Sequence, residues 1–291
     1  MDDVDLGLIY TWRDARALGA RRAQIAGDGV RVSRGLYLSS VVTPTLVARC
    51  RAWSRLLPPG AAFGLETAAE LFGLPINGSP DVHAVVSPRK VLPQRRGLRV
   101  HVRRLEDADV IELGGLCVTS PARTYLDLAA RRSAAELVVI GDALLRSGRL
   151  DAQELERRLA RADGVRGVVR ARACAPLLSP FAMSRPESLM RFWLMSSDLP
   201  TPDVQVPIVD RWGQVVAHAD LGYTRWKIAL EYEGRQHAES DQFGRDIDRY
   251  SLMAADGWLV LRFAARHVNG PAVVLDRTRR ALVSRGWRPG S

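Results

Sequence analysis

Acidic side chains recur with strand spacing in the last third of the sequence. Asp220 lies in one short apolar stretch, and Glu231 and Glu233 lie two residues apart in the next one. Because side chains alternate faces along a strand, Glu231 and Glu233 share a face, and a hairpin register that places Asp220 beside Glu231 would gather three carboxylates. Like charges this close repel each other and shift each other's pKa unless a cation compensates them. Mg²⁺ or Mn²⁺ is the natural candidate, since both are hard ions that prefer oxygen ligands.

The motifs around these carboxylates resemble a known nuclease family. They are Asp220, then Glu231-x-Glu233-Gly234 with His237, then Arg245-Asp246-x-Asp248-Arg249, then Gly257-Trp258-x-Val260-Leu261-Arg262-Phe263. In this order and spacing they resemble the very-short-patch-repair-like endonuclease domain, which belongs to the PD-(D/E)XK superfamily. The resemblance implies an α/β core with a mixed sheet, with Asp220 and Glu231 as metal ligands and Glu187 as a supporting carboxylate from the first helix. At one position the chain departs from the superfamily: Glu233 stands where the superfamily has Lys. The short-patch-repair relatives use a nearby His instead, a role that His237 would fill here.

On this interpretation the catalytic residues are Glu187, Asp220, Glu231, Glu233 and His237. A metal on Asp220 and Glu231 would activate a water and His237 would move a proton, so that a DNA phosphodiester is hydrolysed. Arg245 and Arg249 lie one helical turn apart and would hold DNA phosphate. Structural alternatives stay open. Asp220 and Glu231 are buried salt-bridge partners in one of them, and Glu187 is the acid of a capping box after Ser184 in another. Arg245 and Arg249 would in a third pair with Asp246, Asp248 or Glu233.

The N-terminal residues predict two short helices followed by a strand, a tight turn and a strand. Thr11 and Asp14 fit the start of the first helix, and Gly27-Asp28-Gly29 ends the second. Helix, turn, helix and β-ribbon make a winged helix. Arg21, Arg22 and Gln24 would then lie in a major groove, where Arg reads guanine and Gln reads adenine, and Arg31 and Arg34 on the wing would contact phosphate. The structural alternative is a small helical hairpin with a solvated basic face.

This N-terminal pattern and the segments that follow it resemble the type IV abortive-infection antitoxins, the AbiEi-like family. The matching positions are Gly19, Arg21, Arg22, the Arg34-Gly35-x-Tyr37 wing, the helix from Leu65 to Pro75, and Gly115 to Leu128. The resemblance implies a transcriptional regulator that pairs with a nucleotidyltransferase toxin. Between two expected strands a basic turn carries Arg89, Lys90, Arg95 and Arg96, which suits either a phosphate backbone or a solvated loop.

Length and composition bound the remaining possibilities. The 291 residues allow two or three domains, and the apolar fraction of 47% is that of an ordinary globular protein. A net charge of +10 and a pI near 10.3 favour a polyanionic partner, usually nucleic acid. No apolar run is long enough to span a bilayer, the N-terminus is unlike a signal peptide, and the three cysteines indicate neither disulfides nor zinc. We therefore expect a cytoplasmic protein with no membrane partner.

The sequence predicts an α+β multidomain chain: a winged-helix DNA-binding domain at residues 1–42, an antitoxin-like α/β middle domain at 43–179, and a restriction-endonuclease-like domain of the PD-(D/E)XK type at 180–291. The expected function is DNA binding with Mg²⁺- or Mn²⁺-dependent endodeoxyribonuclease activity. The alternative is an antitoxin-like transcriptional repressor whose nuclease-like domain is catalytically inactive. DNA is the expected partner, a nucleotidyltransferase toxin is a second one, and a homo-oligomer is compatible with the sequence.

Overall fold

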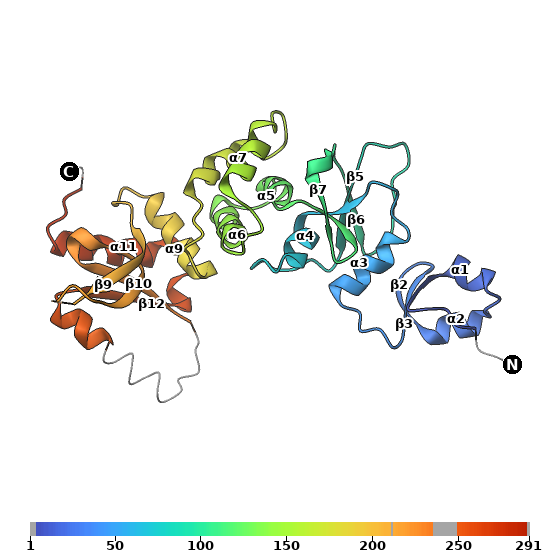
Figure 1. Cartoon of the computed structure of the whole chain (residues 1–291), viewed down its shortest axis with the longest axis horizontal. Coiled ribbons are helices and arrows are strands. Elements are labelled where there is room, and N and C mark those ends of the chain that lie inside the picture. The colour runs from blue at the N-terminus through green and yellow to red at the C-terminus, as the bar shows by residue number, and fades with distance from the viewer. Residues whose placement is uncertain (1–3, 211, 235–248, 290–291) are drawn as a thin grey trace. The chain divides into compact units, whose positions relative to one another are not determined.

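The chain folds into two compact units, which we describe separately. The computed structural model describes residues 4–210, 212–234 and 249–289 (Figure 1). Unit 1 comprises Met1–Arg131 and Arg157–Val168, and unit 2 comprises Arg132–Glu156 and Val169–Ser291. Both units mix helices with sheets, so the predicted α+β class is confirmed. The domain limits at residues 42 and 179 stay a prediction.

Unit 1 begins with a small three-stranded sheet and two short helices. The elements are β1 (Ile9–Thr11), α1 (Trp12–Ala17), α2 (Arg22–Asp28), β2 (Gly29–Ser33) and β3 (Leu36–Ser39), with the antiparallel strand order β1-β3-β2. Thr11 caps α1 as its sequence predicts: its hydroxyl accepts from the Asp14 amide at 3.1 Å and its own amide donates to the Asp14 carboxylate at 3.3 Å. Tyr10 and Ile25 are buried between the sheet and the helices. The two helices and the hairpin are therefore present, and their action as a winged helix stays a prediction.

The rest of unit 1 is built on a five-stranded mixed sheet with helices packed against it. Its strands are β4 (Ala62–Phe63), β5 (Val82–Val86), β6 (Leu98–Val102), β7 (Val110–Leu113) and β8 (Leu116–Thr119), in the order β6-β5-β4-β8-β7. The helices are α3 (Leu46–Ser54), α4 (Leu65–Leu71), the short 3-10 turn η1 (Asp107–Asp109) and α5 (Pro121–Ala129). Phe63 pairs with Val118 in parallel, so the two-residue strand β4 lies at the centre of the sheet.

A buried ion-pair network connects α5 to the η1 turn that precedes β7. Arg123 donates to Asp127 at 3.0 Å and to Asp109 at 2.9 Å, and Arg158 from α7 (Ala152–Ala160) donates to the same Asp109 carboxylate. The two acids and both arginines are buried. Removing one partner of such a network leaves the other charges buried without compensation, which costs far more than the loss of a surface pair.

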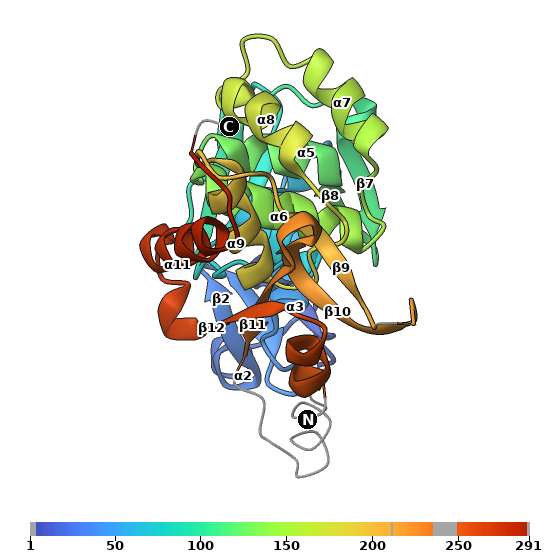
Figure 2. The ribbon, with the colours of Figure 1, turned by 90° about the vertical axis from the view of Figure 1, so that its left-hand side faces the viewer.

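Unit 2 is a four-stranded sheet with helices on both faces. The strands are β9 (Asp203–Val209), β10 (Val215–Tyr223), β11 (Ile228–Glu233) and β12 (Leu259–Ala264), in the order β12-β11-β10-β9. The helices are α6 (Ala134–Arg146), α8 (Val168–Cys174), the 3-10 turn η2 (Ala175–Leu177), α9 (Arg185–Met195) and α11 (Pro271–Ser284), and residues 249–255 are also helical. β9 and β10 form a long antiparallel hairpin (Figure 2), whereas β11 and β12 are parallel, so the sheet is mixed as expected.

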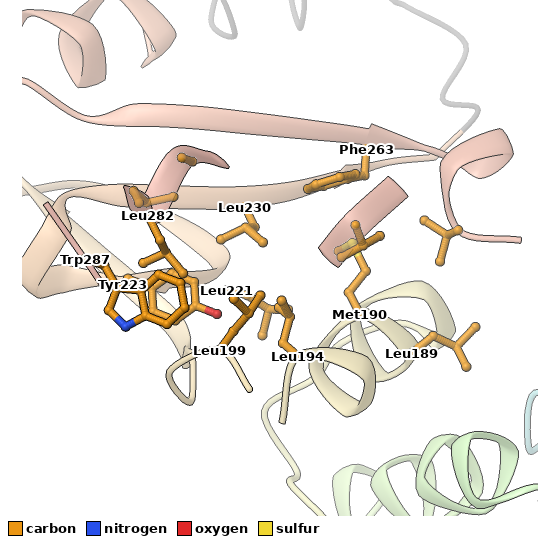
Figure 3. Packing of buried hydrophobic residues seen from close by; sticks show 14 of the residues in the cluster. Leu189, Met190, Leu194, Leu199, Leu221, Tyr223, Leu230, Phe263, Leu282 and Trp287 are labelled. Atoms are coloured by element: carbon orange, nitrogen blue, oxygen red, sulfur yellow. The ribbon is translucent and has the colours of Figure 1, made fainter. Parts of the chain in front are cut away.

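Apolar packing fixes α9 against this sheet. Met190 and Leu194 of α9 point toward Leu230 and Phe263 of the strands, and Leu282 of α11 completes the same cluster (Figure 3). All five side chains are almost fully buried. The N-terminal end of α9 is thereby fixed beside the ends of β10 and β11, where the predicted acidic residues lie. Among the residues that the structure describes, no helix is both long and apolar enough to cross a membrane.

The Asp109–Arg123 network gives a stability prediction. Replacing Arg123 by Ala should lower the free energy of unfolding by about 3–5 kcal/mol, because Asp109 and Asp127 then remain buried without their shared cation. Urea unfolding followed by circular dichroism measures the change. The control is Arg280→Ala, which removes an exposed pair with Asp276 and should cost less than about 1 kcal/mol. Equal losses in the two variants would contradict the assigned role of the network.

Candidate functional site

The structure brings three of the predicted acidic residues together in unit 2. The antiparallel ladder pairs Leu221 of β10 with Leu230 of β11, so the next positions in this register are Asp220 and Glu231. The Asp220 carboxylate accepts a hydrogen bond from the Tyr232 amide at 2.8 Å. The hairpin therefore has the register that places Asp220 beside Glu231, which the sequence allowed but did not determine.

Glu187 of α9 is both a helix cap and a member of this acidic group. Its carboxylate accepts from the Ser184 hydroxyl at 2.7 Å and from the Met183 amide at 2.7 Å, and its own amide donates to the Ser184 hydroxyl at 3.4 Å. This differs from the expected capping box, in which the amide of Ser184 itself would donate to Glu187. Burial raises the pKa of Glu187, and the charge of Asp220 raises it further. The cap and the acidic cluster therefore share one residue.

Burial governs the protonation of the other two acids as well. It raises the pKa of Asp220, and the Tyr232 amide and Arg249 partly oppose the rise. It also raises the pKa of Glu231, where the Tyr250 hydroxyl and Arg249 oppose the rise and Asp220 adds to it. Buried carboxylates whose pKa is raised need either a nearby positive charge or a proton. We call Glu187, Asp220 and Glu231 the carboxylate cluster.

The positive charge beside the cluster comes from the protein itself. Arg249 donates to Glu231 Oε2 at 2.7 Å, and the Tyr250 hydroxyl donates to the same oxygen at 2.6 Å. The neighbouring Glu233 pairs with Arg262, and its Oε1 atom lies 3.3 Å from the Tyr250 hydroxyl oxygen. Sequence reasoning missed Tyr250 and Arg262, although an arginine inside the otherwise apolar strand β12 was a usable signal.

A divalent metal does not fit the cluster in this arrangement. Within the described ranges, no group of three or more His, Cys, Asp or Glu side chains is placed to hold a metal ion. Glu231 Oε2 is held by Arg249 and Tyr250, and both oxygens of Glu187 are held by the start of α9. The predicted roles of His237 and Arg245 fall on residues outside the described ranges. Mg²⁺ or Mn²⁺ binding by Asp220 and Glu231 stays a prediction.

A second candidate site is a basic cleft in unit 1. It has a volume of about 970 Å³ and joins two segments that are distant in sequence. The turn between β2 and β3 contributes Arg31 and Arg34, and the segment before β6 contributes Arg95 and Arg96, all four exposed. The remaining lining residues are Val32, Ser33, Pro80, Asp81, Gln94 and Gly97. We call this the arginine cleft.

Main-chain acceptors hold the two sides of the arginine cleft together. Arg95 donates to the carbonyl of Arg34 at 2.6 Å, and the Ser33 hydroxyl donates to the carbonyl of Arg96 at 3.1 Å. Asp81, the acid in the lining, is paired with Arg99 at 2.7 Å. The cleft is therefore positively charged, and the backbones of its two arginine-bearing segments are held together.

The other residues predicted to bind DNA lie elsewhere. Arg21 and Arg22 are exposed at the start of α2, and Arg89 and Lys90 are exposed but do not line the cleft. Gln24 donates its side-chain amide to the Val4 carbonyl at 3.1 Å and lines a separate pocket of about 420 Å³. Arg249 lies at the carboxylate cluster.

Unit 1 also contains a pair of histidines, the buried His83 and the half-buried His101, that sequence spacing did not mark as a site. The rings of His83 and His101 are stacked with their centroids 5.1 Å apart, and the Nδ1 atom of His83 lies 3.0 Å from Glu66. Burial, followed by the charge of His83, lowers the pKa of His101 to about 4. Burial alone would raise the pKa of Glu66, but hydrogen bonds from His83 and Arg131 lower it to about 2.

The chain is similar to one known domain family and to two known proteins. Residues 61–177 match the AbiEi antitoxin C-terminal domain. Over 236 residues the chain is 30% identical to the uncharacterized proteins MT2308 and Rv2248 from two strains of Mycobacterium tuberculosis, with 81% of this chain and 85% of each relative covered. The crystal structure of the RV2827C protein from Mycobacterium tuberculosis is 18% identical and covers 59% of this chain and 72% of that chain, with a TM-score of 0.44. That TM-score is too low for conclusions about this chain.

The His83–His101 pair predicts a pH dependence of stability. The pKa of His101 is lower in the fold than the ordinary 6.5, so the unfolded chain binds the proton more strongly. The stabilising contribution is therefore complete above pH 6.5 and is lost as the pH falls toward 4. The stabilising contribution of Glu66 is complete above pH 4.5 and is lost only as the pH falls toward 2, because its pKa is lowered from 4.5 to about 2. Glu66 therefore does not affect the change in stability between pH 7 and pH 5.

Urea unfolding at pH 7 and pH 5 measures this effect. His101→Gln should show a smaller loss of stability between the two pH values than the wild type, whereas substitution of the exposed His218 by Gln should leave the loss unchanged. An unchanged pH dependence in His101→Gln would show that another group is responsible.

Proposed function

We propose that this chain is a DNA-binding regulator of the antitoxin type. It belongs to one family with the two Mycobacterium tuberculosis proteins. Its residues 61–177 match the AbiEi antitoxin C-terminal domain. The antitoxin match supports this function better than it supports a nuclease. In this proposal unit 2 has no catalytic role. A nucleotidyltransferase toxin is the second partner that the antitoxin resemblance implies.

The arginine cleft is the observation that carries the DNA-binding proposal. Arg31, Arg34, Arg95 and Arg96 present guanidinium groups from two segments around one depression. Guanidinium groups bind phosphate oxygens in a planar, bidentate geometry, and a polyanion gains affinity from each phosphate that is neutralised. A duplex backbone that follows the cleft would contact both segments at once. Arg21 and Arg22 on α2 would contribute base contacts in the winged-helix interpretation.

The cleft is preorganised for this task. Arg95 and Ser33 connect its two sides through main-chain carbonyls. The separation of the two backbone segments that carry the arginines is thus set before the ligand arrives, which reduces the entropy lost on binding. The net charge of +10 adds long-range attraction for nucleic acid, which falls with salt.

The test is DNA binding by the double variant Arg34→Ala/Arg96→Ala. Both docking bonds use the main-chain carbonyls of these residues, so alanine removes the two guanidinium groups and retains the connection. Fluorescence anisotropy with duplex DNA from upstream of the chain's own gene should show affinity lowered about tenfold. The slope of log K against log salt should become less steep by about 2, since each lost phosphate contact contributes about 0.9.

The matched control is Arg104→Ala, which removes an exposed arginine of the same unit that does not line the cleft. It should retain wild-type affinity and salt slope. If both variants lose affinity equally, the loss reflects total charge and the cleft is not the binding site. If the wild type binds no duplex, the proposed function is wrong.

A second candidate function is the metal-dependent endonuclease, favoured by one observation. Glu187, Asp220 and Glu231 converge from three elements, as the nuclease resemblance implies. Incubating supercoiled plasmid with the protein in Mg²⁺ or Mn²⁺ distinguishes the two functions. A non-catalytic regulator leaves the plasmid intact, whereas nicking that disappears in Glu231→Ala would establish the nuclease.

A further inference from the structure

The acidic region of unit 2 contains arginines as well as acids. Three arginines face four carboxylates. Against the rise that burial causes, the charge of Arg146 lowers the pKa of Glu187, and the charge of Arg249 lowers the pKa values of Asp220 and Glu231. Arg262 forms an ion pair with Glu233. Arg146 and Arg262 have further attachments, since Arg146 donates to the Ala182 carbonyl and Arg262 lies over the Tyr250 ring, with its Cζ atom 4.4 Å from the centroid. Arg249 is the arginine that acts on both strand acids, Asp220 and Glu231.

Tyr250 fixes Arg249 in that place. The Arg249 Cζ atom lies 4.9 Å from the centroid of the Tyr250 ring, and Arg249 Nη2 lies 2.8 Å from the Tyr250 hydroxyl. The same hydroxyl donates to Glu231 Oε2, the oxygen that also accepts from Arg249. Arginine, tyrosine and glutamate thus form a closed triangle of short hydrogen bonds. Such an arrangement restricts all three side chains at once.

We propose that Arg249, held by Tyr250, is the built-in counter-ion of the carboxylate cluster and excludes a divalent cation from it. A metal ion needs several oxygens with lone pairs directed at one point. Here Glu231 Oε2 is engaged by two donors, Asp220 Oδ2 accepts from Tyr232, and both oxygens of Glu187 cap α9. A cation at Glu231 Oε2 would have to displace both Arg249 and the Tyr250 hydroxyl.

One buried oxygen shows that the cluster retains capacity for a further positive charge. Glu231 Oε1 has no hydrogen-bond partner within the described part of the chain, although Glu231 is only 4% exposed. An unpaired buried carboxylate oxygen is costly. Removing Arg249 would leave Glu231 with both its charge and this oxygen uncompensated. The site would then attract a small hard cation.

The experiment measures Mn²⁺ binding to the full chain without DNA, by the electron paramagnetic resonance signal of free Mn²⁺. Arg249→Gln should bind Mn²⁺ at least about tenfold more tightly than the wild type, because one positive charge next to two carboxylates is lost. Arg249→Lys retains the charge and should bind as weakly as the wild type. Adding Glu231→Gln to Arg249→Gln should abolish the gain.

The matched control is Arg262→Gln. Arg262 contacts the same Tyr250 ring, and the variant loses the same net charge, but Arg262 forms its ion pair with Glu233 and acts on Glu231 more weakly than Arg249 does. Its gain should be less than about threefold. A gain equal to that of Arg249→Gln would show that total charge controls the site and would overturn the proposal.

Tyr250→Phe protects the test against a folding defect in Arg249→Gln. This variant retains the ring and removes only the hydroxyl that holds Arg249 and Glu231. It should also bind Mn²⁺ more tightly than the wild type, by a smaller factor. If neither variant gains affinity, or if the wild type already binds Mn²⁺ at micromolar concentration, the counter-ion role is wrong. DNA binding is not part of this measurement, so its outcome and that of the arginine cleft test are independent.

Discussion

The pairing of buried carboxylates with arginine is the interaction on which both units depend. In unit 1, Arg123 lies between Asp109 and Asp127. In unit 2, Arg191 holds the buried Asp142 of α6 at 2.8 Å, and Arg249 holds Glu231. Guanidinium is suited to such places because it stays charged and presents several donors in a fixed plane. The acids in the interior are therefore paired with guanidinium groups of the protein itself.

This use of arginine changes how the overall charge is understood. Part of the arginine content neutralises internal acids, and that part contributes nothing to the outer field of the protein. The arginines of the cleft differ because the acid among its lining residues, Asp81, already has its own partner in Arg99. Excess positive charge is thus concentrated where two chain segments meet. Net charge alone indicated a polyanionic partner, but only the fold shows which arginines are available to it.

Local features of the fold were accessible from the sequence. The register that places Asp220 beside Glu231 was one that the sequence allowed, and the spacing of Thr11 with Asp14 and of Ser184 with Glu187 gave two helix starts. These depend on neighbours within one element or one hairpin. The pairing of Glu231 with Arg249 was open as an alternative but could not be chosen, because it depends on how the helix at 249–255 packs against the sheet. The meeting of Arg34 with Arg95 could not be foreseen for the same reason, since 61 residues separate them.

The docking of the β2–β3 turn onto the segment before β6 has an evolutionary consequence. Its acceptors are the peptide carbonyls of positions 34 and 96, and its donors are the side chains of positions 33 and 95. Any amino acid other than one that distorts the backbone supplies the same carbonyl. Positions 34 and 96 can therefore mutate while the architecture persists, whereas positions 33 and 95 are constrained. Relatives could in this way diversify their ligand preference on an unchanged scaffold.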